Sequence, residues 1–344
     1  MERFEHGGDI YSHEGTVDFS ANLNPLGMPA AVVEALHANV ERYDAYPDPT
    51  CRALRAAIAH AEGVPAGQVL CTAGATDLMQ RICLALRPTC ALVTAPCFSG
   101  YEEALEQAGV TIMRHELCEE DSFHVTGRFV DDVSRNPGAL VFLCNPNNPT
   151  GLTIEHDLIV RAAGAARDAG STVVLDECFL DFTREPSMVP LCGEFPNLVV
   201  MRAFTKLYAM AGLRLGYGIC SDAALLERVR AAGQTWAVST PAQVAGIAAL
   251  GVDGWAERTR AYVDAERTKL ADALRSLGLR VVDGKANYLM FQCRMGLYEP
   301  LLERGFLIRR CANYQGLDST WYRIAVRTAE ENDALIAALR TVLG

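Results

Sequence analysis

The feature of this sequence that most limits its fold is a series of short apolar segments separated by segments with helical spacing. We expect strands at residues 68–72, 91–94, 110–113, 139–143, 172–175 and 198–201. Helices are expected at residues 29–40, 50–61, 76–86, 102–107 and 157–169. Strands that are apolar along their whole length lie in parallel sheets whose two faces are both covered by helices. The pattern therefore predicts an α/β fold with a mostly parallel sheet.

The last third of the chain has a different pattern. A long helical region is expected at residues 241–277, followed by strands at 279–282, 288–292, 307–309 and 321–326 and helices at 296–303 and 330–343. A chain of 344 residues is long enough for two packed lobes. We therefore predict an N-terminal arm of residues 1–30, a large domain of residues 31–250 and a small α+β domain of residues 251–344.

Charge and cysteine usage exclude several classes of function. The net charge of -11 argues against binding to nucleic acid or to an anionic membrane surface. The 12 cysteines form no C-x-x-C pair and no cluster with zinc-ligand spacing, so no metal site is expected. Several cysteines lie in apolar runs, which is typical of free thiols in a reducing compartment. These observations predict a cytoplasmic protein.

Polar side chains follow three of the expected strands. Asp176 ends an apolar run, Asn145 follows another, and the pair Thr205 and Lys206 follows a third, with Arg214 eight residues after the lysine. Functional sites in parallel sheets lie at the carboxyl ends of the strands. We therefore expect these side chains to converge, although a lone lysine or a strand-end acid is more often a solvated surface group.

A lysine, a buried acid, hydroxyl groups and an arginine match the groups of pyridoxal 5'-phosphate (PLP). The lysine can form a Schiff base with the aldehyde, and the acid can keep the pyridine nitrogen protonated. Arginine and hydroxyl groups can bind the phosphate. The set therefore predicts PLP as the cofactor.

With these residues, the chain resembles the fold-type I PLP enzymes of the aspartate aminotransferase superfamily along essentially its whole length. The segments HGGDI at 6–10, DFSANLNPLG at 18–27 and IRRCANYQGLDS at 308–319 further resemble the threonine-phosphate decarboxylases of cobalamin biosynthesis. The histidinol-phosphate aminotransferases are the next most similar group. The resemblance implies a large domain with a seven-stranded sheet and a homodimer with shared active sites.

The resemblance assigns roles on the cofactor side. It implies that Lys206 carries the cofactor, that Asp176 pairs with its ring nitrogen and that Asn148 bonds its phenolic oxygen. It also implies that Phe98 stacks on the ring, where the alternative is an ordinary core phenylalanine. The helix start at 74–76 is expected to bind phosphate through backbone N–H groups. The expected phosphate site consists of Gly74, Ala75, Thr76, Thr205 and Arg214, with Tyr46 contributed by the neighbouring subunit.

The resemblance also implies a substrate side with two arginines. Arg323 is expected to bind the α-carboxylate, since a guanidinium on an apolar strand needs an anionic partner, although a buried structural ion pair is the alternative. Arg309 is expected to bind a substrate phosphate, and His6 and Asn22 on the arm are expected to help. We interpret Arg327 as a salt-bridge residue.

Two positions depart from the pattern of the family. Ala203 stands where many members have a serine that bonds the phosphate, which removes one donor worth about 1 kcal/mol. Phe179 stands where many aminotransferases have a tyrosine. The second departure is compatible with the decarboxylase group.

The implied activity is PLP-dependent decarboxylation of L-threonine O-3-phosphate to (R)-1-amino-2-propanol O-2-phosphate. The alternative is a histidinol-phosphate aminotransferase or another class I/II aminotransferase, because residue patterns do not reveal which bond is broken at the α-carbon. A third possibility is a PLP-binding regulatory protein without turnover. The complete set of lysine, acid and two arginines argues against it.

Overall fold

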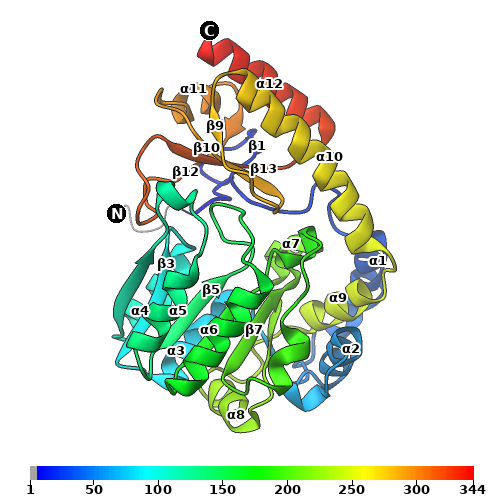
Figure 1. Ribbon diagram of the computed structural model, residues 1–344. Coiled ribbons are helices and arrows are strands. Elements are labelled where there is room, and N and C mark those ends of the chain that lie inside the picture. The colour runs from blue at the N-terminus through cyan, green and yellow to red at the C-terminus, as the bar shows by residue number, and fades with distance from the viewer. Residues whose placement is uncertain (1–5) are drawn as a thin grey trace.

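The computed structural model describes residues 6–344, so the first five residues of the predicted arm lie outside the described residues. The chain forms a larger lobe and a smaller lobe, which lie one above the other in Figure 1. The larger lobe contains a seven-stranded sheet. In spatial order its strands are β2 (Val69–Thr72), β8 (Gly216–Ile219), β7 (Leu198–Ala203), β6 (Thr172–Asp176), β5 (Leu140–Cys144), β3 (Cys90–Ala95) and β4 (Thr111–Glu116).

Six of these strands are parallel to one another, and β8 alone runs antiparallel to both of its neighbours, β2 and β7. The mostly parallel sheet is therefore confirmed, but β8 has no counterpart among the predicted strands. Its Gly216-Tyr217-Gly218 segment carries little strand signal, since glycine is depleted in strands. A Cβ atom at Gly216 would lie 2.7 Å from the backbone nitrogen of Ala75. Close packing against the start of helix α3 (Ala75–Leu86) thus explains the glycine.

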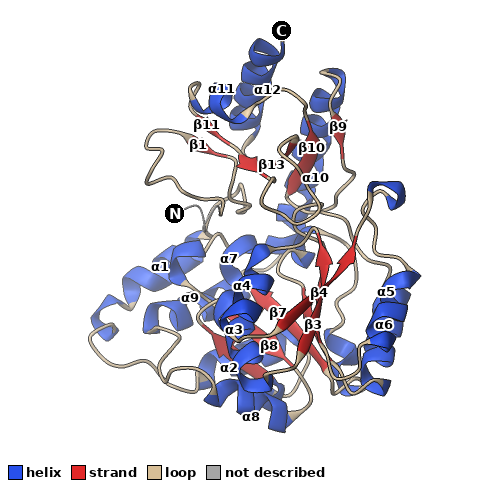
Figure 2. Cartoon of the chain, turned by 90° about the vertical axis from the view of Figure 1, so that its left-hand side faces the viewer, coloured by secondary structure: helices blue, strands red, loops and turns tan. Residues whose placement is uncertain are grey.

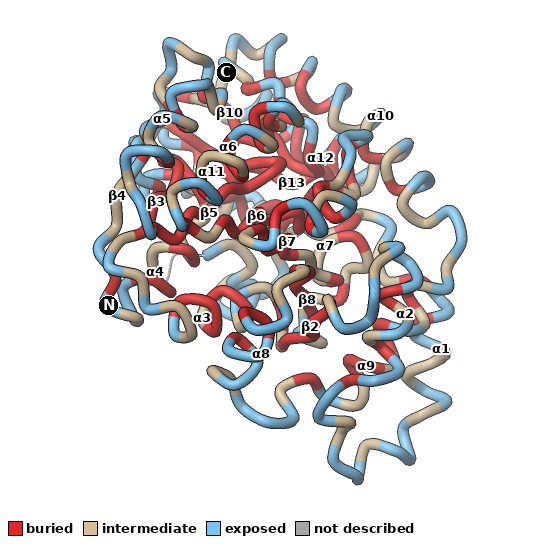
Figure 3. The backbone as a smooth tube through the Cα atoms, turned by 60° about the horizontal axis from the view of Figure 1, so that its bottom comes forward, coloured by how far each residue is buried: buried red, intermediate tan, exposed pale blue. Residues whose placement is uncertain are grey.

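Helices cover both faces of the large sheet because successive strand residues point to opposite sides. One core contains Val93, Phe142 and Val174, and the other contains their neighbours in β3, β5 and β6. The first core is covered by α3 (Ala75–Leu86), α4 (Ser99–Gln107) and α8 (Ala223–Ala231). The second is covered by α2 (Arg52–Glu62), α5 (Gly127–Arg135), α6 (His156–Asp168) and α9 (Thr240–Leu250). Figure 3 shows buried residues along the central strands.

The smaller lobe contains a separate antiparallel sheet, as Figure 2 shows. Its strands are β12 (Arg309–Arg310), β13 (Trp321–Ala325), β10 (Tyr288–Gln292) and β9 (Arg280–Val281). Helix α10 (Trp255–Ser276) extends from the larger lobe to the smaller one, where α12 (Ala329–Leu343) packs beside it (Figure 1). The small lobe also contains α11 (Tyr298–Leu302) and β11 (Phe306–Leu307).

The predicted arm is joined to the small lobe by a short parallel ladder. Strand β1 (Val17–Asp18) pairs with β11, and the carbonyl of Phe19 accepts a hydrogen bond from the backbone nitrogen of Ala325 at 2.8 Å. The arm leads into α1 (Ala30–Ala38), which packs on α9. Much later in the chain, the short helix α7 (Phe204–Leu207) directly follows β7. Asn24 of the arm donates to the carbonyls of Lys206 and Leu207 in α7, so the arm is bonded to both lobes.

Several expected elements differ in detail. The predicted helical region at 241–277 is two helices, α9 and α10, separated by a turn that contains Gly251 and Gly254. The proposed boundary between residues 250 and 251 lies in this turn. Helices α5 and α8 have no counterpart in the prediction. Within residues 6–344, no helix combines the length and the apolar character needed to span a bilayer.

Candidate active site

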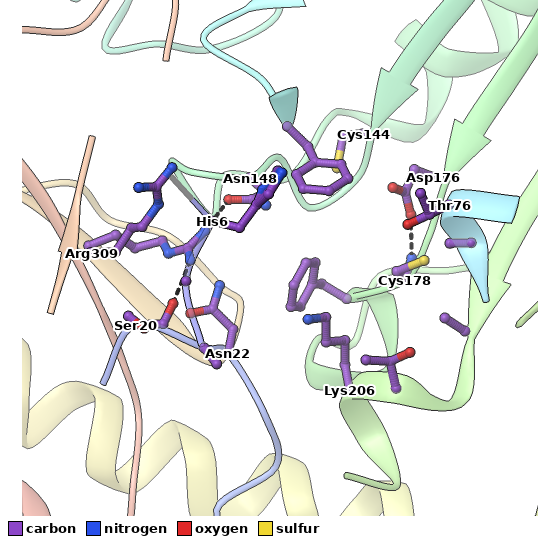
Figure 4. A pocket seen from close by; sticks show the side chains of 18 of the residues that line it. His6, Ser20, Asn22, Thr76, Cys144, Asn148, Asp176, Cys178, Lys206 and Arg309 are labelled. Carbon is purple, nitrogen blue, oxygen red and sulfur yellow. Dashed lines mark hydrogen bonds between the residues drawn. The ribbon is translucent and has the colours of Figure 1, made fainter. Parts of the chain in front are cut away.

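A cavity of about 240 Å³ lies between the arm, the carboxyl ends of the large-sheet strands and the small lobe. Figure 4 shows Asp176, Thr76 and Lys206 on one side of it and Arg309, Ser20 and Asn22 on the other. Most of the predicted site residues line this cavity. They are His6, Asn22, Ala75, Thr76, Phe98, Asn148, Asp176, Thr205, Lys206, Arg214, Arg309 and Arg323.

The acid of the site is held by two donors. Asp176 is the last residue of β6 and is 7% exposed. Its Oδ2 atom accepts a hydrogen bond of 2.6 Å from the hydroxyl of Tyr101, and its Oδ1 accepts one of 2.9 Å from the backbone nitrogen of Cys178. The phenol of Tyr101 stacks on Phe142, with ring centroids 5.0 Å apart. A carboxylate bonded in this way can face a cationic ring nitrogen without moving.

The lysine of the site is half-buried. Lys206 lies in the short helix α7, directly after β7, and its Nζ atom sits 5.4 Å from the ring centroid of Phe179. Burial, and then the positive charge of Arg323, lowers the pKa of Lys206 to about 8. A neutral amine is therefore accessible near physiological pH, and only the neutral form can attack an aldehyde.

The opposite end of the cofactor side is a phosphate-binding arrangement. Ala75 and Thr76 form the first turn of α3, where backbone N–H groups are free to bind an anion. Arg214 adopts left-handed backbone angles and reaches the same wall. A Cβ atom at Gly74 would come 2.8 Å from Nη2 of Arg214, so the glycine lets the guanidinium lie against the helix start. Gly74 supports this corner but is not among the lining residues.

The aromatic wall is built by the start of α4. Phe98 directly precedes this helix and packs edge-on against Tyr101, with centroids 5.6 Å apart. A Cβ atom at Gly100 would come 2.4 Å from the ring of Phe98. The missing side chain at Gly100 therefore leaves space for the Phe98 ring at the cavity wall.

Arg323 on β13 connects three parts of the chain. Its Nη1 donates to Oδ1 of Asn148 and, at 3.2 Å, to the hydroxyl of Tyr314, while its Nη2 donates to the carbonyl of Ser20 at 2.8 Å. Among residues 6–344, its buried Nε has no hydrogen-bond partner. Oδ1 of Asn148 accepts from Arg323, and the amide nitrogen of the same side chain remains as a donor for a ligand.

Arg309 on β12 is opposite Arg323 in the antiparallel ladder. It is buried, donates to Oδ1 of Asn313 at 2.8 Å, and its Cζ lies 5.3 Å from the ring centroid of Tyr314. No carboxylate pairs with either Arg309 or Arg323 within the described residues, so the structural ion pair considered for Arg323 is not found there. Two buried guanidinium groups thus border one small cavity.

The arm forms the remaining wall. His6 makes a 3.1 Å contact with Glu103 through Nε2 and lies 6.1 Å from the ring of Phe98. A Cβ atom at Gly7 would come 2.2 Å from the carbonyl oxygen of Ser20, which explains how closely the arm packs there. The Oδ1 atom of Asn22 is buried and lacks a partner among residues 6–344.

Three further residues lie away from the cavity. Tyr46 is 81% exposed and stacks on Trp236, with centroids 4.7 Å apart. Glu177 is buried behind Asp176, where it accepts bonds from the Ser187 hydroxyl and the backbone of Met188. Arg327 pairs with Glu331 at 2.7 Å, which confirms it as a salt-bridge residue.

Two contributors to the site were not predicted. Tyr101 stands three residues after Phe98, a helical spacing that could have indicated a shared face. Tyr314 belongs to the segment that carries the resemblance to decarboxylases, yet nothing local shows that its side chain reaches the cavity. Ala203 and Phe179, the two departures from the family pattern, both line the cavity.

The residues present fit PLP. A buried carboxylate that accepts bonds on both oxygens suits a protonated ring nitrogen, and the start of α3 with Arg214 suits a phosphate. Among residues 6–344, Nζ of Lys206 makes no hydrogen bond or ion pair, so it is available to bind an aldehyde.

Comparisons with known proteins identify relatives of this chain. The family model "Aminotransferase class I and II" matches residues 14–339. Threonine-phosphate decarboxylase of Salmonella typhimurium is 39% identical over 98% of this chain and 96% of its own length. A histidinol-phosphate aminotransferase of Caldanaerobacter subterraneus is 32% identical over 94% of this chain and 92% of its own.

A solved structure gives the same result for the fold. The L-threonine-O-3-phosphate decarboxylase of Porphyromonas gingivalis superposes with a TM-score of 0.83 at 26% identity, covering 94% of this chain and 98% of its own. The residues matched by the family model, 14–339, include the arm after residue 13, most of both lobes and all the residues that line the cavity except His6 and Gly7. The chain belongs to the class I and II aminotransferase family, whose members are PLP-dependent enzymes.

Proposed function

We propose that this protein is a PLP-dependent decarboxylase of L-threonine O-3-phosphate that releases CO2 and (R)-1-amino-2-propanol O-2-phosphate. The observation that carries the proposal is the pair of buried arginines, Arg309 and Arg323, which line the same cavity as Lys206 and Asp176. Figure 4 shows Arg309 across the cavity from Lys206 and Asp176. Two guanidinium groups suit a substrate with two anionic groups, a carboxylate and a phosphate. The 39% identical threonine-phosphate decarboxylase supports the same substrate.

On the substrate side, we assign the carboxylate to Arg323 and the phosphate to Arg309. The unpartnered Nε of Arg323 gives a buried donor that an anion would satisfy. Among the described residues, the guanidinium of Arg309 donates to a single amide oxygen, Oδ1 of Asn313, which leaves N–H donors for a phosphate. Asn22 and His6 on the arm cover the substrate from the remaining side.

On the cofactor side, bound PLP would withdraw electrons from the bond that breaks at the α-carbon of the substrate. Asp176 would hold the ring nitrogen protonated, with Tyr101 fixing the orientation of its carboxylate. Asn148 would donate its amide to the phenolic oxygen, and Phe98 would cover the ring. We assign the proton that returns to the α-carbon to Nζ of Lys206, whose lowered pKa suits transfer near neutral pH.

We further propose a homodimer in the cytoplasm. Tyr46 and Trp236 are stacked and exposed, at 81% and 46%, which is typical of aromatic side chains in a protein interface. In such a dimer, Tyr46 would reach the phosphate of the neighbouring subunit.

All 12 cysteines are free thiols, which supports a reducing compartment.

The alternative is a histidinol-phosphate aminotransferase, supported by the 32% identical relative. Histidinol phosphate carries an amine and a phosphate, so Arg309 would suit it. It has no carboxylate, however, and Arg323 would remain without an anion when it is bound. A site built around a buried donor discriminates against ligands that leave the donor unpaired.

The test is to incubate the PLP-loaded protein with L-threonine O-3-phosphate and no oxo-acid. We expect CO2 and the amino-alcohol phosphate in equal amounts. A parallel reaction supplies histidinol phosphate with 2-oxoglutarate and measures glutamate. Glutamate formation without any release of CO2 from threonine phosphate would overturn the proposal and support the alternative.

A further inference from the structure

We propose that Tyr314 is a positioning residue that holds the two arginines of the cavity in register and thereby selects substrates with both a carboxylate and a phosphate. The inference rests on the proposed function, because it takes Arg323 and Arg309 as the carboxylate and phosphate sites. Tyr314 itself is 5% exposed and lines the cavity.

The hydroxyl of Tyr314 connects the two lobes. It accepts a hydrogen bond of 3.2 Å from Nη1 of Arg323 on the small lobe. It also lies 3.4 Å from Oδ1 of Asn148, to which it donates, in the loop after β5 of the large lobe. Arg323 donates to the same Oδ1 atom. The three groups form a closed triangle, so loss of the hydroxyl would leave the Arg323 and Asn148 pair with one support fewer.

The ring of Tyr314 acts on the other arginine. Cζ of Arg309 lies 5.3 Å from the ring centroid, a distance at which a guanidinium and an aromatic ring attract each other. Arg309 and Arg323 face each other across the β12–β13 ladder. One side chain therefore contacts both cations, through its hydroxyl on one and its ring on the other.

The backbone around Tyr314 is well anchored. Its nitrogen donates to the carbonyl of Cys311 at 3.0 Å, and its carbonyl accepts from the nitrogen of Leu317 at 3.0 Å. The side chain packs in a small core that contains residues of both lobes. These residues are Leu117, Phe123, Leu152, Val282, Met290, Cys311 and Trp321. A residue fixed in this way can set the positions of its neighbours.

The two parts of the Tyr314 side chain therefore have different roles. The hydroxyl supports the carboxylate site, and the ring supports the phosphate site. Ligands that carry only one anion would depend on only one part. Substrate selection would then come from the spacing of the two arginines in addition to their charges.

The experiment measures dissociation constants from the change in PLP absorbance on ligand binding, using the PLP-loaded protein. Three ligands separate the sites: L-threonine O-3-phosphate has both anions, L-threonine has only the carboxylate, and phosphoethanolamine has only the phosphate. The variants are Tyr314→Phe, which removes only the hydroxyl, and Tyr314→Leu, which removes the ring as well. Tyr322→Phe is the matched control, because this buried hydroxyl accepts from the backbone of Leu297 and does not line the cavity.

We expect Tyr314→Phe to raise the dissociation constants of L-threonine O-3-phosphate and L-threonine by about tenfold. The dissociation constant of phosphoethanolamine should stay within about twofold of the wild-type value. Tyr314→Leu should in addition raise the dissociation constant of phosphoethanolamine by about threefold to tenfold. Tyr322→Phe should bind all three ligands as the wild type does.

The inference would be overturned if Tyr314→Phe raised the dissociation constants of all three ligands equally, or raised none of them. Failure of the proposed function has a different signature, in which the wild type binds threonine phosphate no better than threonine and releases no CO2. In that case the comparison of L-threonine with phosphoethanolamine still decides whether the hydroxyl supports the carboxylate site.

Discussion

The two walls of the cavity differ in how completely their polar groups are bonded. On the wall from the large sheet, both oxygens of Asp176 accept hydrogen bonds, from the hydroxyl of Tyr101 and from the backbone nitrogen of Cys178. On the wall from the arm and the small lobe, Nε of Arg323 and Oδ1 of Asn22 are buried without partners among residues 6–344. In Figure 4, Asp176 and Cys178 lie on one side of the cavity and Asn22 lies on the other.

The difference teaches which wall is complete before a ligand arrives. An unsatisfied buried polar group costs about 1–3 kcal/mol, so the arm and small-lobe wall carries a cost that a ligand can remove. An anionic group would satisfy the Nε donor of Arg323, and an N–H donor such as the substrate amine would satisfy Oδ1 of Asn22. The large-sheet wall carries no such cost at Asp176. We infer that the acid of the cofactor wall is fixed before a ligand binds, whereas the bonding of the substrate wall is completed by the substrate.

The largest effect is expected from Lys206→Ala on the cofactor wall. Loss of the amine should reduce CO2 release by about 1,000-fold or more and abolish the visible absorbance of lysine-linked PLP. Retention of that absorbance, with trapping by borohydride, would place the link on another lysine and contradict the description of this wall.

The second largest loss of activity is expected from Arg323→Ala on the substrate wall. Removal of a charged, bidentate donor should lower kcat/KM for threonine phosphate by about 100-fold, mostly through KM. Arg327→Ala is the matched control, because Arg327 follows the same strand but pairs with Glu331 outside the cavity. Unchanged kinetics in Arg323→Ala would move the carboxylate site elsewhere.

Tyr101→Phe tests whether the cofactor wall depends on the bonding behind it. The variant keeps the ring stacked on Phe142 but removes the 2.6 Å hydrogen bond to Asp176. We expect about tenfold loss in kcat and weaker retention of PLP during dialysis, with little change in KM. An equal loss in Tyr322→Phe would show that any buried hydroxyl of this protein has such an effect.

Gly7→Ala sharpens the role of the arm. The added Cβ would meet the carbonyl of Ser20 at 2.2 Å, so the arm must shift together with His6. We expect KM for threonine phosphate to rise about threefold to tenfold while PLP affinity stays unchanged, since ordering of a short segment is worth about 1 kcal/mol. Gly127→Ala, where a Cβ meets nothing within 4 Å, is the control. Normal KM in Gly7→Ala would exclude the arm from substrate binding.

The smallest effect concerns stability behind the cofactor wall. Burial raises the pKa of Glu177 to about 7, above the value of 4.5 expected when unfolded. The folded state therefore holds this proton more tightly, and the stabilisation is lost as the pH rises from about 4.5 through 7. Denaturant unfolding measures the free energy of unfolding at pH 5 and at pH 8. Between these two pH values it should fall further for the wild type than for Glu177→Gln. Identical losses would contradict the assignment.

Much of the cofactor wall could be predicted because its residues follow apolar strands that are visible in the sequence. Asp176 ends β6, and Lys206 follows β7 by three residues. The strand β8 could not be predicted in the same way, since its glycines are required by contact with the start of α3. Tyr101 was also missed, because its role depends on an acid that lies 75 residues away in the chain.

The sequence by itself determined the parallel sheet, the cofactor and the polar residues at the strand ends, since these follow from local patterns of apolar and polar residues. Only the tertiary structure decided how the substrate wall is assembled. Arg323 contacts Asn148 across 175 residues of sequence and Ser20 across 303. Such contacts are produced by packing of the arm and two lobes around one cavity, and no local pattern encodes that packing.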